Sequence, residues 1–375
     1  MNRFRISTPE GTRDLLFSSC RALRQTENAV RDALEERGYS EIITPAVEYF
    51  DVFAQANPEL DQDQMLKIID KSGRICVARP DNTTPIARIA ATRLDDAALP
   101  VRLYYSQKVF RSVSGDHGHK GEFLQVGAEF IGADGLEADK DILSAAFAAL
   151  SKTGADNFRV ELGHAEIYKA LMDELGADAQ SAEGIRRLIE NKSFAALGDA
   201  LEPFKGKPAA KALSAMPNLF GGIEVLDEVE SLTGNVRVLG ATAYLRRLYQ
   251  ALDEAGYGDR IMIDLGLVHE MDYYTGIMFR GYIGGAGAAI LAGGRYNALC
   301  AKFGKDMPAG GFGIDVESVA ESLAGASRPE VATRRDTVRI ALTKGRLEKK
   351  TLALLKAAGY DISELEAGTR KLIFT

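Results

Sequence analysis

Cysteine and histidine are scarce in this chain of 375 residues, which contains three cysteines and four histidines. The cysteines lie far apart and form no Cys-x-x-Cys pair, which argues against a disulfide framework and against a zinc ribbon. His117 and His119 share a glycine-containing loop, but no further histidine or cysteine cluster completes a metal site with them. We therefore expect neither a metal nor a cofactor, and the expected compartment is the reducing cytoplasm.

Long apolar runs and an excess of positive charge are also missing. No run reaches the roughly 18 apolar residues that a membrane span requires, and residues 1–17 lack the apolar core and cleavage site of a signal peptide. The chain has 46 basic and 53 acidic residues, which gives a net charge of −7. Nucleic-acid binding draws most of its affinity from basic side chains that contact phosphate. We therefore expect neither a membrane nor tRNA as a partner.

Hydrophobic residues make up 46% of the chain, enough for a large core in two or three domains. Their periodicity and the turn residues between them predict a chain that contains both helices and strands. The expected elements are a helix over 18–37, a strand over 41–50 broken at Pro45, a hairpin around 71–73, a helix over 83–94, and two antiparallel strands over 101–113 and 120–133.

The pattern also predicts a division of the chain. Alanine, leucine and charged residues recur at helical spacing over about 167–258, which indicates a helical insertion in a core domain of residues 1–326. Residues 327–336 are charged and poor in apolar side chains, as is typical of a linker. Residues 337–375 form one strand–helix–strand unit, which is a partial α/β segment because a doubly wound domain needs more strands.

Polar side chains mark a candidate site in the first half of the core. Asp81 and Thr83 either cap the helix that follows or offer an anion and a hydroxyl to a ligand. Gln125 and Glu129 share one face of their strand, which is either a solvated face or, given the apolar residues around it, a desolvated one. Since a buried glutamate without a partner is costly, Arg111 is the candidate counter-ion.

Two further segments have both structural and functional interpretations. Alternation along a strand would turn one of Tyr273 and Tyr274 inward, where its phenol would line a cavity, although ordinary aromatic packing would look the same. The glycines of 284–287 and 293–294 match no phosphate-binding loop. A turn and a close-packed sheet are the favoured interpretation of these glycines.

In their order and spacing, five segments resemble the catalytic core of histidyl-tRNA synthetase, a class II aminoacyl-tRNA synthetase fold. They are PEGTRDLL, ARPDNTTPIAR, VFRSVSGDHGHKGEFLQVGAEFIG, LVHEMDYYTGIMF and GGRYNALCAKFG with PAGGFGI, and the resemblance covers roughly residues 7–325. It implies an α+β fold, with a class II synthetase-like antiparallel sheet flanked by helices, in a protein that is usually dimeric.

The departures from this family concern ATP. Val113 and Ser114 stand where the resemblance places a glutamate that positions adenine and an arginine. His269 replaces a catalytic arginine, and Ser318 replaces the arginine that would hold the γ-phosphate. Loss of one such donor costs about 100- to 1,000-fold in rate. The resemblance therefore implies a chain that does not activate an amino acid at the rate of a synthetase.

The amino-acid pocket of that family is better preserved. By position, the resemblance assigns the α-ammonium of histidine to Asp81, Thr83 and Gln125, its carboxylate to Arg111, and its imidazole to Glu129 and Tyr274, with Tyr273 beside them. These residues imply a pocket that binds histidine without activating it.

This combination is similar to the regulatory subunits of ATP phosphoribosyltransferase, a histidyl-tRNA-synthetase-like family of histidine biosynthesis. The resemblance implies that L-histidine is the effector and that a short-form catalytic subunit is the partner, which the protein activates and subjects to feedback inhibition. It also implies a homodimer within a hetero-oligomer. Residues 338–375 resemble the start of that catalytic subunit, without its phosphoribosyl pyrophosphate loop.

The alternative function is an enzymatic one, a minimal histidine-activating ligase that acts on an acceptor other than tRNA. Val113, Ser114 and Ser318 all favour the regulatory subunit. Histidine-dependent exchange of pyrophosphate with ATP separates the two.

Overall fold

A computed structural model describes the chain in two units, Met1–Ala326 and Ser327–Thr375. The described residues are 7–56, 62, 65–94, 97–112, 120–268, 273–326 and 354–356. Of the second unit, only residues 354–356 are described, and they are helical. The expected linker and the rest of the expected α/β segment therefore lie outside the described residues, as do Val113, Ser114, His117, His119 and His269.

A nine-stranded sheet forms the centre of the first unit, in the order β1-β5-β6-β12-β11-β10-β7-β9-β8. Its strands are β1 (Ser40–Glu41), β5 (Val101–Phe110), β6 (Glu122–Ile131), β12 (Ala309–Asp315), β11 (Leu291–Arg295), β10 (Ile277–Tyr282), β7 (Arg159–His164), β9 (Ile261–Asp264) and β8 (Phe220–Gly221). The predicted fold class is confirmed, with one refinement. The sheet is mixed, because β1 runs parallel to β5 and β7 runs parallel to β9.

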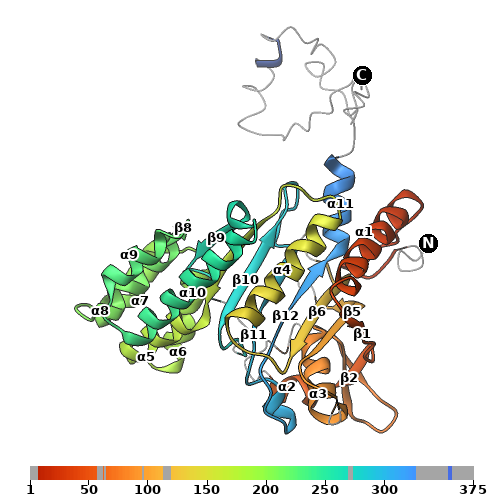
Figure 1. Cartoon of the computed structure of the whole chain (residues 1–375), viewed down its shortest axis with the longest axis horizontal. Coiled ribbons are helices and arrows are strands. Elements are labelled where there is room, and N and C mark those ends of the chain that lie inside the picture. The colour runs from red at the N-terminus through yellow and green to blue at the C-terminus, as the bar shows by residue number, and fades with distance from the viewer. Residues whose placement is uncertain are drawn as a thin grey trace. The chain divides into compact units, whose positions relative to one another are not determined.

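Helices cover one face of this sheet and enclose the main core (Figure 1). They are α1 (Ser18–Glu35), α4 (Leu136–Lys152), α10 (Val236–Glu254) and α11 (Val316–Ala326). On β6, Leu124, Val126 and Phe130 belong to the same buried cluster as Phe147 of α4. Alternation along the strand turns Gln125, Gly127 and Glu129 to the opposite face. The pleat therefore separates the core side chains of β6 from the polar ones.

A run of helices connects β7 to β9. It comprises α5 (Ala165–Leu175), α6 (Ala179–Glu190), α7 (Phe194–Leu201), α8 (Pro208–Ala215), α9 (Val225–Leu232) and α10. Parallel strands need a long crossover connection, and this helical segment supplies it. His164 caps the N-terminus of α5, because its Nδ1 accepts a hydrogen bond from the Glu166 backbone N–H at 3.2 Å. Burial lowers the pKa of His164 to about 4, which keeps that nitrogen available as an acceptor.

A second, three-stranded sheet has the order β2-β4-β3. It consists of β2 (Val47–Tyr49), β4 (Ile75–Ala78) and β3 (Lys67–Ile69), and α2 (Phe50–Ala56) follows β2. The expected strand over 41–50 divides into β1 and β2 on either side of Pro45, because proline has no N–H to donate to a ladder. Helix α3 (Thr83–Arg93) then leads to the main sheet. In the described ranges, every helix is too short or too polar to span a bilayer.

Candidate ligand-binding site

The candidate site lies on the face of the main sheet that α3 covers. Tyr105 of β5, Ile86 of α3 and the tyrosines at 274 and 296 belong to one buried cluster there. Tyr105 pairs with Gly127 in the β5–β6 register, so it shares the face of Gln125 and Glu129. The structure thus brings the polar face of β6 under α3, where Glu129 is buried and Gln125 is half-buried.

Glycines of the neighbouring strands let the polar side chains of β6 lie flat on the sheet. Gly311 pairs with Glu129 across β12 and β6. A Cβ at Gly311 would lie 1.8 Å from Glu129 Oε2, and a Cβ at Gly313 would lie 2.5 Å from Gln125 Nε2. A Cβ at Gly294 would lie 2.6 Å from the Tyr274 ring. The close-packed sheet predicted for the glycines at 293–294 is confirmed.

Glu129 is completely buried at the centre of this face, with an exposed fraction of 0%. The hydroxyl of Thr83 donates to its Oε1 at 2.7 Å, and the hydroxyl of Tyr296 donates to its Oε2. Burial raises the pKa of Glu129 to about 8, against the lowering effect of the two hydroxyls. The carboxyl is therefore mostly protonated at neutral pH.

Arg111 is not the counter-ion of Glu129, contrary to the sequence-based expectation. Its side chain is exposed, and its guanidinium lies 5.5 Å from the centre of the Phe123 ring. Hydroxyl groups satisfy Glu129 instead. Sequence analysis did not assign Tyr296 to the site, although the GGRYN segment that contains it supported the resemblance.

Asp81 takes the structural role that the sequence left open. Its Oδ1 accepts a hydrogen bond from the Thr84 backbone N–H at 2.8 Å, and its Oδ2 accepts one from the Thr84 hydroxyl at 3.2 Å. These bonds satisfy donors in the first turn of α3. Burial raises the pKa of Asp81, while the bonds to Thr84 and the charges of Arg111 and Arg79 oppose the rise. The positive charge of Arg111 therefore favours the ionised form of Asp81.

Gln125 belongs to a polar chain that the sequence did not reveal. Asn82 Nδ2 donates to Gln125 Oε1 at 3.0 Å, and the hydroxyl of Tyr105 donates to the same oxygen at 3.2 Å. Asn82 is fully buried. No local pattern marks Asn82 or Tyr105, because their contact with Gln125 depends on how α3 and β5 approach β6.

Tyr273 and Tyr274 both pack into the buried cluster of this face. Their ring centres lie 5.0 Å apart, and the Tyr273 ring lies 5.9 Å from that of Tyr296. The prediction that one ring points in and the other out is wrong, because both residues precede β10 and alternation does not apply to them. Lys169 of α5 donates to the Tyr274 carbonyl oxygen at 2.7 Å, which ties this segment to the helical run.

Ser318, which stands where the resemblance places an arginine, lies just after the end of β12. Ser318 Oγ donates to Asp315 Oδ2 at 2.6 Å, and Lys120 Nζ lies 2.9 Å from Ser318 Oγ and 3.3 Å from Asp315 Oδ2. Glu317 accepts a hydrogen bond from the Leu124 backbone N–H at 3.0 Å and pairs with Arg13 at 3.2 Å. Carboxylates thus engage both cations that lie here.

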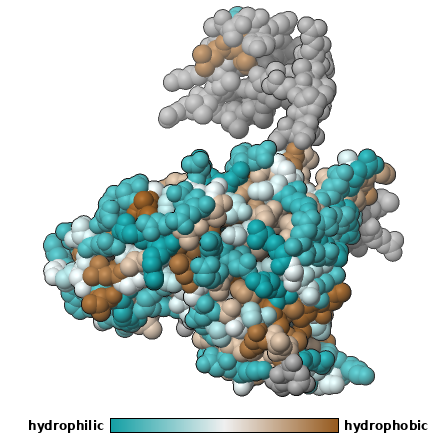
Figure 2. All heavy atoms as spheres, in the orientation of Figure 1, coloured by the Kyte–Doolittle hydropathy of each residue, from teal (hydrophilic) through white to brown (hydrophobic). Residues whose placement is uncertain are grey.

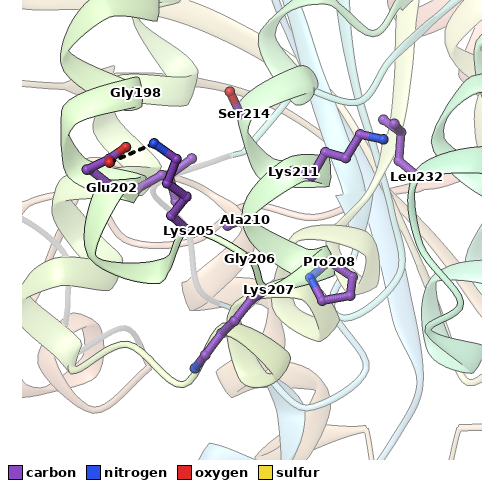
Figure 3. A pocket seen from close by; sticks show the side chains of 11 residues that line it. Gly198, Glu202, Lys205, Gly206, Lys207, Pro208, Ala210, Lys211, Ser214 and Leu232 are labelled. Carbon is purple, nitrogen blue, oxygen red and sulfur yellow. Dashed lines mark hydrogen bonds and ion pairs between the residues drawn. The ribbon is translucent and has the colours of Figure 1, made fainter.

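A separate hollow of about 580 Å³ lies in the helical run, between α7 and α8 (Figure 3). Lys205, Lys207 and Lys211 line it, and Lys205 pairs with Glu202 at 2.9 Å. None of the residues singled out from the sequence lines this hollow. Within the described ranges, no group of three or more histidine, cysteine or acidic side chains is arranged to hold a metal ion.

Comparison with known proteins shows the class to which this fold belongs. The family described as histidyl-tRNA synthetase matches residues 11–319. A crystal structure of a histidyl-tRNA synthetase from Nostoc shares the fold, with a TM-score of 0.70 at 20% identity over 95% of this chain and 85% of that one. The class is therefore that of histidyl-tRNA-synthetase-like folds.

More similar proteins define the family within this class. A protein of Clostridium kluyveri named ATP phosphoribosyltransferase regulatory subunit is 41% identical over 326 residues, which cover 86% of this chain and 83% of that protein. A protein of Bacillus mycoides with the same name is 36% identical and covers 90% and 80%. A crystal structure from Bacillus halodurans, described as an ATP phosphoribosyltransferase regulatory subunit/histidyl-tRNA synthetase, has a TM-score of 0.79 at 31% identity, over 86% of this chain and 84% of that one.

The chain belongs to the family of ATP phosphoribosyltransferase regulatory subunits. The family predicted from the sequence motifs is confirmed.

Proposed function

We propose that this protein is the regulatory subunit of an ATP phosphoribosyltransferase in the cytoplasm, at the first step of histidine biosynthesis. It binds L-histidine, activates a short-form catalytic subunit, and transmits feedback inhibition by histidine to that subunit. One observation carries the proposal: Glu129 is buried among hydroxyl groups on the polar face of β6, while carboxylates engage the cations at the end of β12. The family names support the partner.

The pocket offers a group for each part of the histidine zwitterion. Asp81 is the anion for the ammonium, with Thr83 and Gln125 beside it. Arg111 is exposed next to the pocket and acts on Asp81 electrostatically, so a ligand carboxylate there would meet its charge. The imidazole takes the place next to Glu129, Tyr273 and Tyr274. This assignment keeps the roles that the resemblance implies and adds Tyr296 as the residue that holds Glu129.

The end of β12 does not favour histidine activation. Charge on the phosphates of ATP needs cationic donors that are free to meet it. Lys120 is engaged by Asp315 and Ser318, and Arg13 by Glu317. We therefore favour the regulatory function over the ligase.

Replacement of Glu129 by alanine should weaken histidine binding by about tenfold or more, because a hydrogen bond to a charged group in a desolvated pocket contributes roughly 1.5–3 kcal/mol. Calorimetric titration of histidine into the purified protein measures this affinity. Since histidine can inhibit only by favouring one state of the complex, the variant should also resist inhibition when reconstituted with a short-form catalytic subunit.

The matched control is Glu122→Ala on the same strand. Glu122 pairs with Lys108 and does not share the face of Glu129. The Glu122→Ala variant should bind histidine with the affinity of the wild type, and its complex should be inhibited to the same extent. Unchanged affinity and inhibition in Glu129→Ala would place the ligand elsewhere, and failure of histidine to bind the wild type would refute the proposed function.

We also propose that the protein forms a homodimer within the hetero-oligomer, through one apolar face of the small sheet. This face consists of Val47, Tyr49, Leu66 and Ile68, which are 40–46% exposed. Figure 2 shows hydrophobic side chains gathered on the surface near β1 and β2. An exposed apolar face of this kind marks an interaction site, and two copies related by a twofold axis would cover it with itself.

Ile68→Glu should weaken the dimer by about 100-fold or more, because the twofold axis brings two like charges together in an apolar contact. Analytical ultracentrifugation over a concentration series measures the dissociation constant. Val236→Glu is the control, since Val236 is 79% exposed at the start of α10, outside this face. A dimer of equal strength in both variants would rule out this face as the interface.

A further inference from the structure

Glu129 is surrounded by groups that carry no positive charge. Thr83 and Tyr296 donate to its two oxygens. The titratable groups that act on it or share its surroundings come from six segments: Tyr39, Asp81, Tyr105, Tyr273 with Tyr274, Tyr296 and Cys300. Within the described ranges, no lysine, arginine or histidine forms an ion pair with Glu129.

A buried carboxylate in such surroundings lacks the cation that it needs. Asp81 raises the cost further, because its charge also disfavours a second anion nearby. The two hydroxyls satisfy the carboxyl by hydrogen bonds but do not neutralise it. An ionised Glu129 therefore requires a cation from the ligand, and an empty pocket requires a proton.

We propose that the pocket binds the imidazole ring as a cation and that Glu129 supplies the proton. The O–H bond of the Glu129 carboxyl breaks, an N–H bond forms on the ring nitrogen, and the net charge of the complex is unchanged. Thr83 and Tyr296 donate to the carboxylate that results. The inference rests on the proposed histidine site and specifies the charge state that this site selects.

The proton balance follows from two pKa values. Free imidazole has an ordinary pKa of about 6.5, and burial raises the pKa of Glu129 to about 8. Between these values the free ring is mostly neutral and the empty pocket mostly holds its proton. Transfer within the complex then requires no net exchange of protons with the solvent. Below this range binding releases a proton, and above it binding takes one up.

Nitrogen NMR of ring-labelled ¹⁵N-histidine bound to the protein tests this directly at about pH 7.3. We expect the shifts of an imidazolium for the bound ring, although the free ring is mostly neutral at this pH. Calorimetry at the same pH, in buffers of different ionisation enthalpy, should give the same binding enthalpy. Together these results would show that the proton on the bound ring comes from the protein and not from the solvent.

Glu129→Gln removes the proton source and keeps the shape of the side chain. In this variant the bound ring should be neutral, and the affinity at pH 7.3 should fall about tenfold or more. Asp81→Asn serves as a second variant, because Asp81 is the other carboxyl that acts on Glu129, and it should leave the bound ring charged. A neutral ring in Asp81→Asn with a charged one in Glu129→Gln would overturn the assignment to Glu129.

The other outcomes are also decisive. A neutral ring bound to the wild type overturns the inference and leaves the histidine site intact. A charged ring accompanied by uptake of one proton from the buffer shows that Glu129 is already ionised in the empty pocket, which overturns it as well. Absence of any histidine binding overturns the proposed function together with this inference.

Discussion

Glu129→Gln should raise the free energy of unfolding of the ligand-free protein at pH 8 far more than at pH 5. The pKa of Glu129 is about 8 in the folded protein, against an ordinary value of about 4.5 in the unfolded chain. As the pH rises between these values, the unfolded chain loses the proton that the folded protein keeps, so folding becomes less favourable. Each pKa unit corresponds to about 1.4 kcal/mol. The gain from the substitution should therefore grow by on the order of 3 kcal/mol between pH 5 and pH 8.

Urea unfolding of both proteins at the two pH values measures this difference. Glu254→Gln is the matched control, because it makes the same substitution at an exposed position, at the end of α10. Parallel profiles for the wild type and Glu129→Gln would mean that Glu129 ionises normally in the folded protein. That result would also remove the physical basis of the proposed proton transfer.

Arg295→Met should destabilise the protein by about 3–5 kcal/mol, because it leaves a buried charge without its partner. Arg295 is 3% exposed and Asp139 is 1% exposed. Arg295 Nε donates to Asp139 Oδ1 at 2.6 Å, and the hydroxyl of Tyr244 donates to Asp139 Oδ2 at 2.6 Å. These residues join the end of β11 to α4 and α10. Chemical denaturation at pH 7 measures the loss.

Two comparisons separate the buried ion pair from simple loss of a side chain. The double variant Arg295→Met with Asp139→Leu should recover part of the stability, since an apolar pair can replace a buried ion pair at little cost. Arg102→Met breaks a half-exposed pair with Asp141 at 2.8 Å and should cost less than about 1 kcal/mol. Equal losses in Arg295→Met and Arg102→Met would show that burial does not set the strength of the pair.

Local pattern was sufficient for several elements in the first half of the fold. The helix expected over 18–37 is α1, Ser18–Glu35, and the helix expected over 83–94 is α3, Thr83–Arg93. The two long strands are β5 and β6, and they pair in the expected antiparallel sense. Hydrophobic periodicity and turn residues act over a few positions, so the sequence expresses them directly. The break at Pro45 follows from the missing N–H of a single residue.

Pattern also placed Gln125 and Glu129 on one face, because alternation is a local property of a strand. It failed for Tyr273 and Tyr274, which lie outside a strand and pack together. It also failed for Arg111. The apolar neighbours of Glu129 in the sequence predicted that it would be desolvated. They could not predict its hydrogen-bond partners, because hydroxyls and a guanidinium can both satisfy a carboxyl.

The sequence by itself determined α1, α3, the pairing of β5 with β6, the family and the chemical types of most site residues. Only the tertiary structure decided that Thr83 and Tyr296, which are 46 and 167 positions from Glu129, meet its two oxygens. It likewise decided that Gly311 leaves room for this carboxyl. The reason is physical: a propensity depends on neighbours along the chain, whereas the protonation of a buried acid depends on every group that the folded sheet and α3 bring around it.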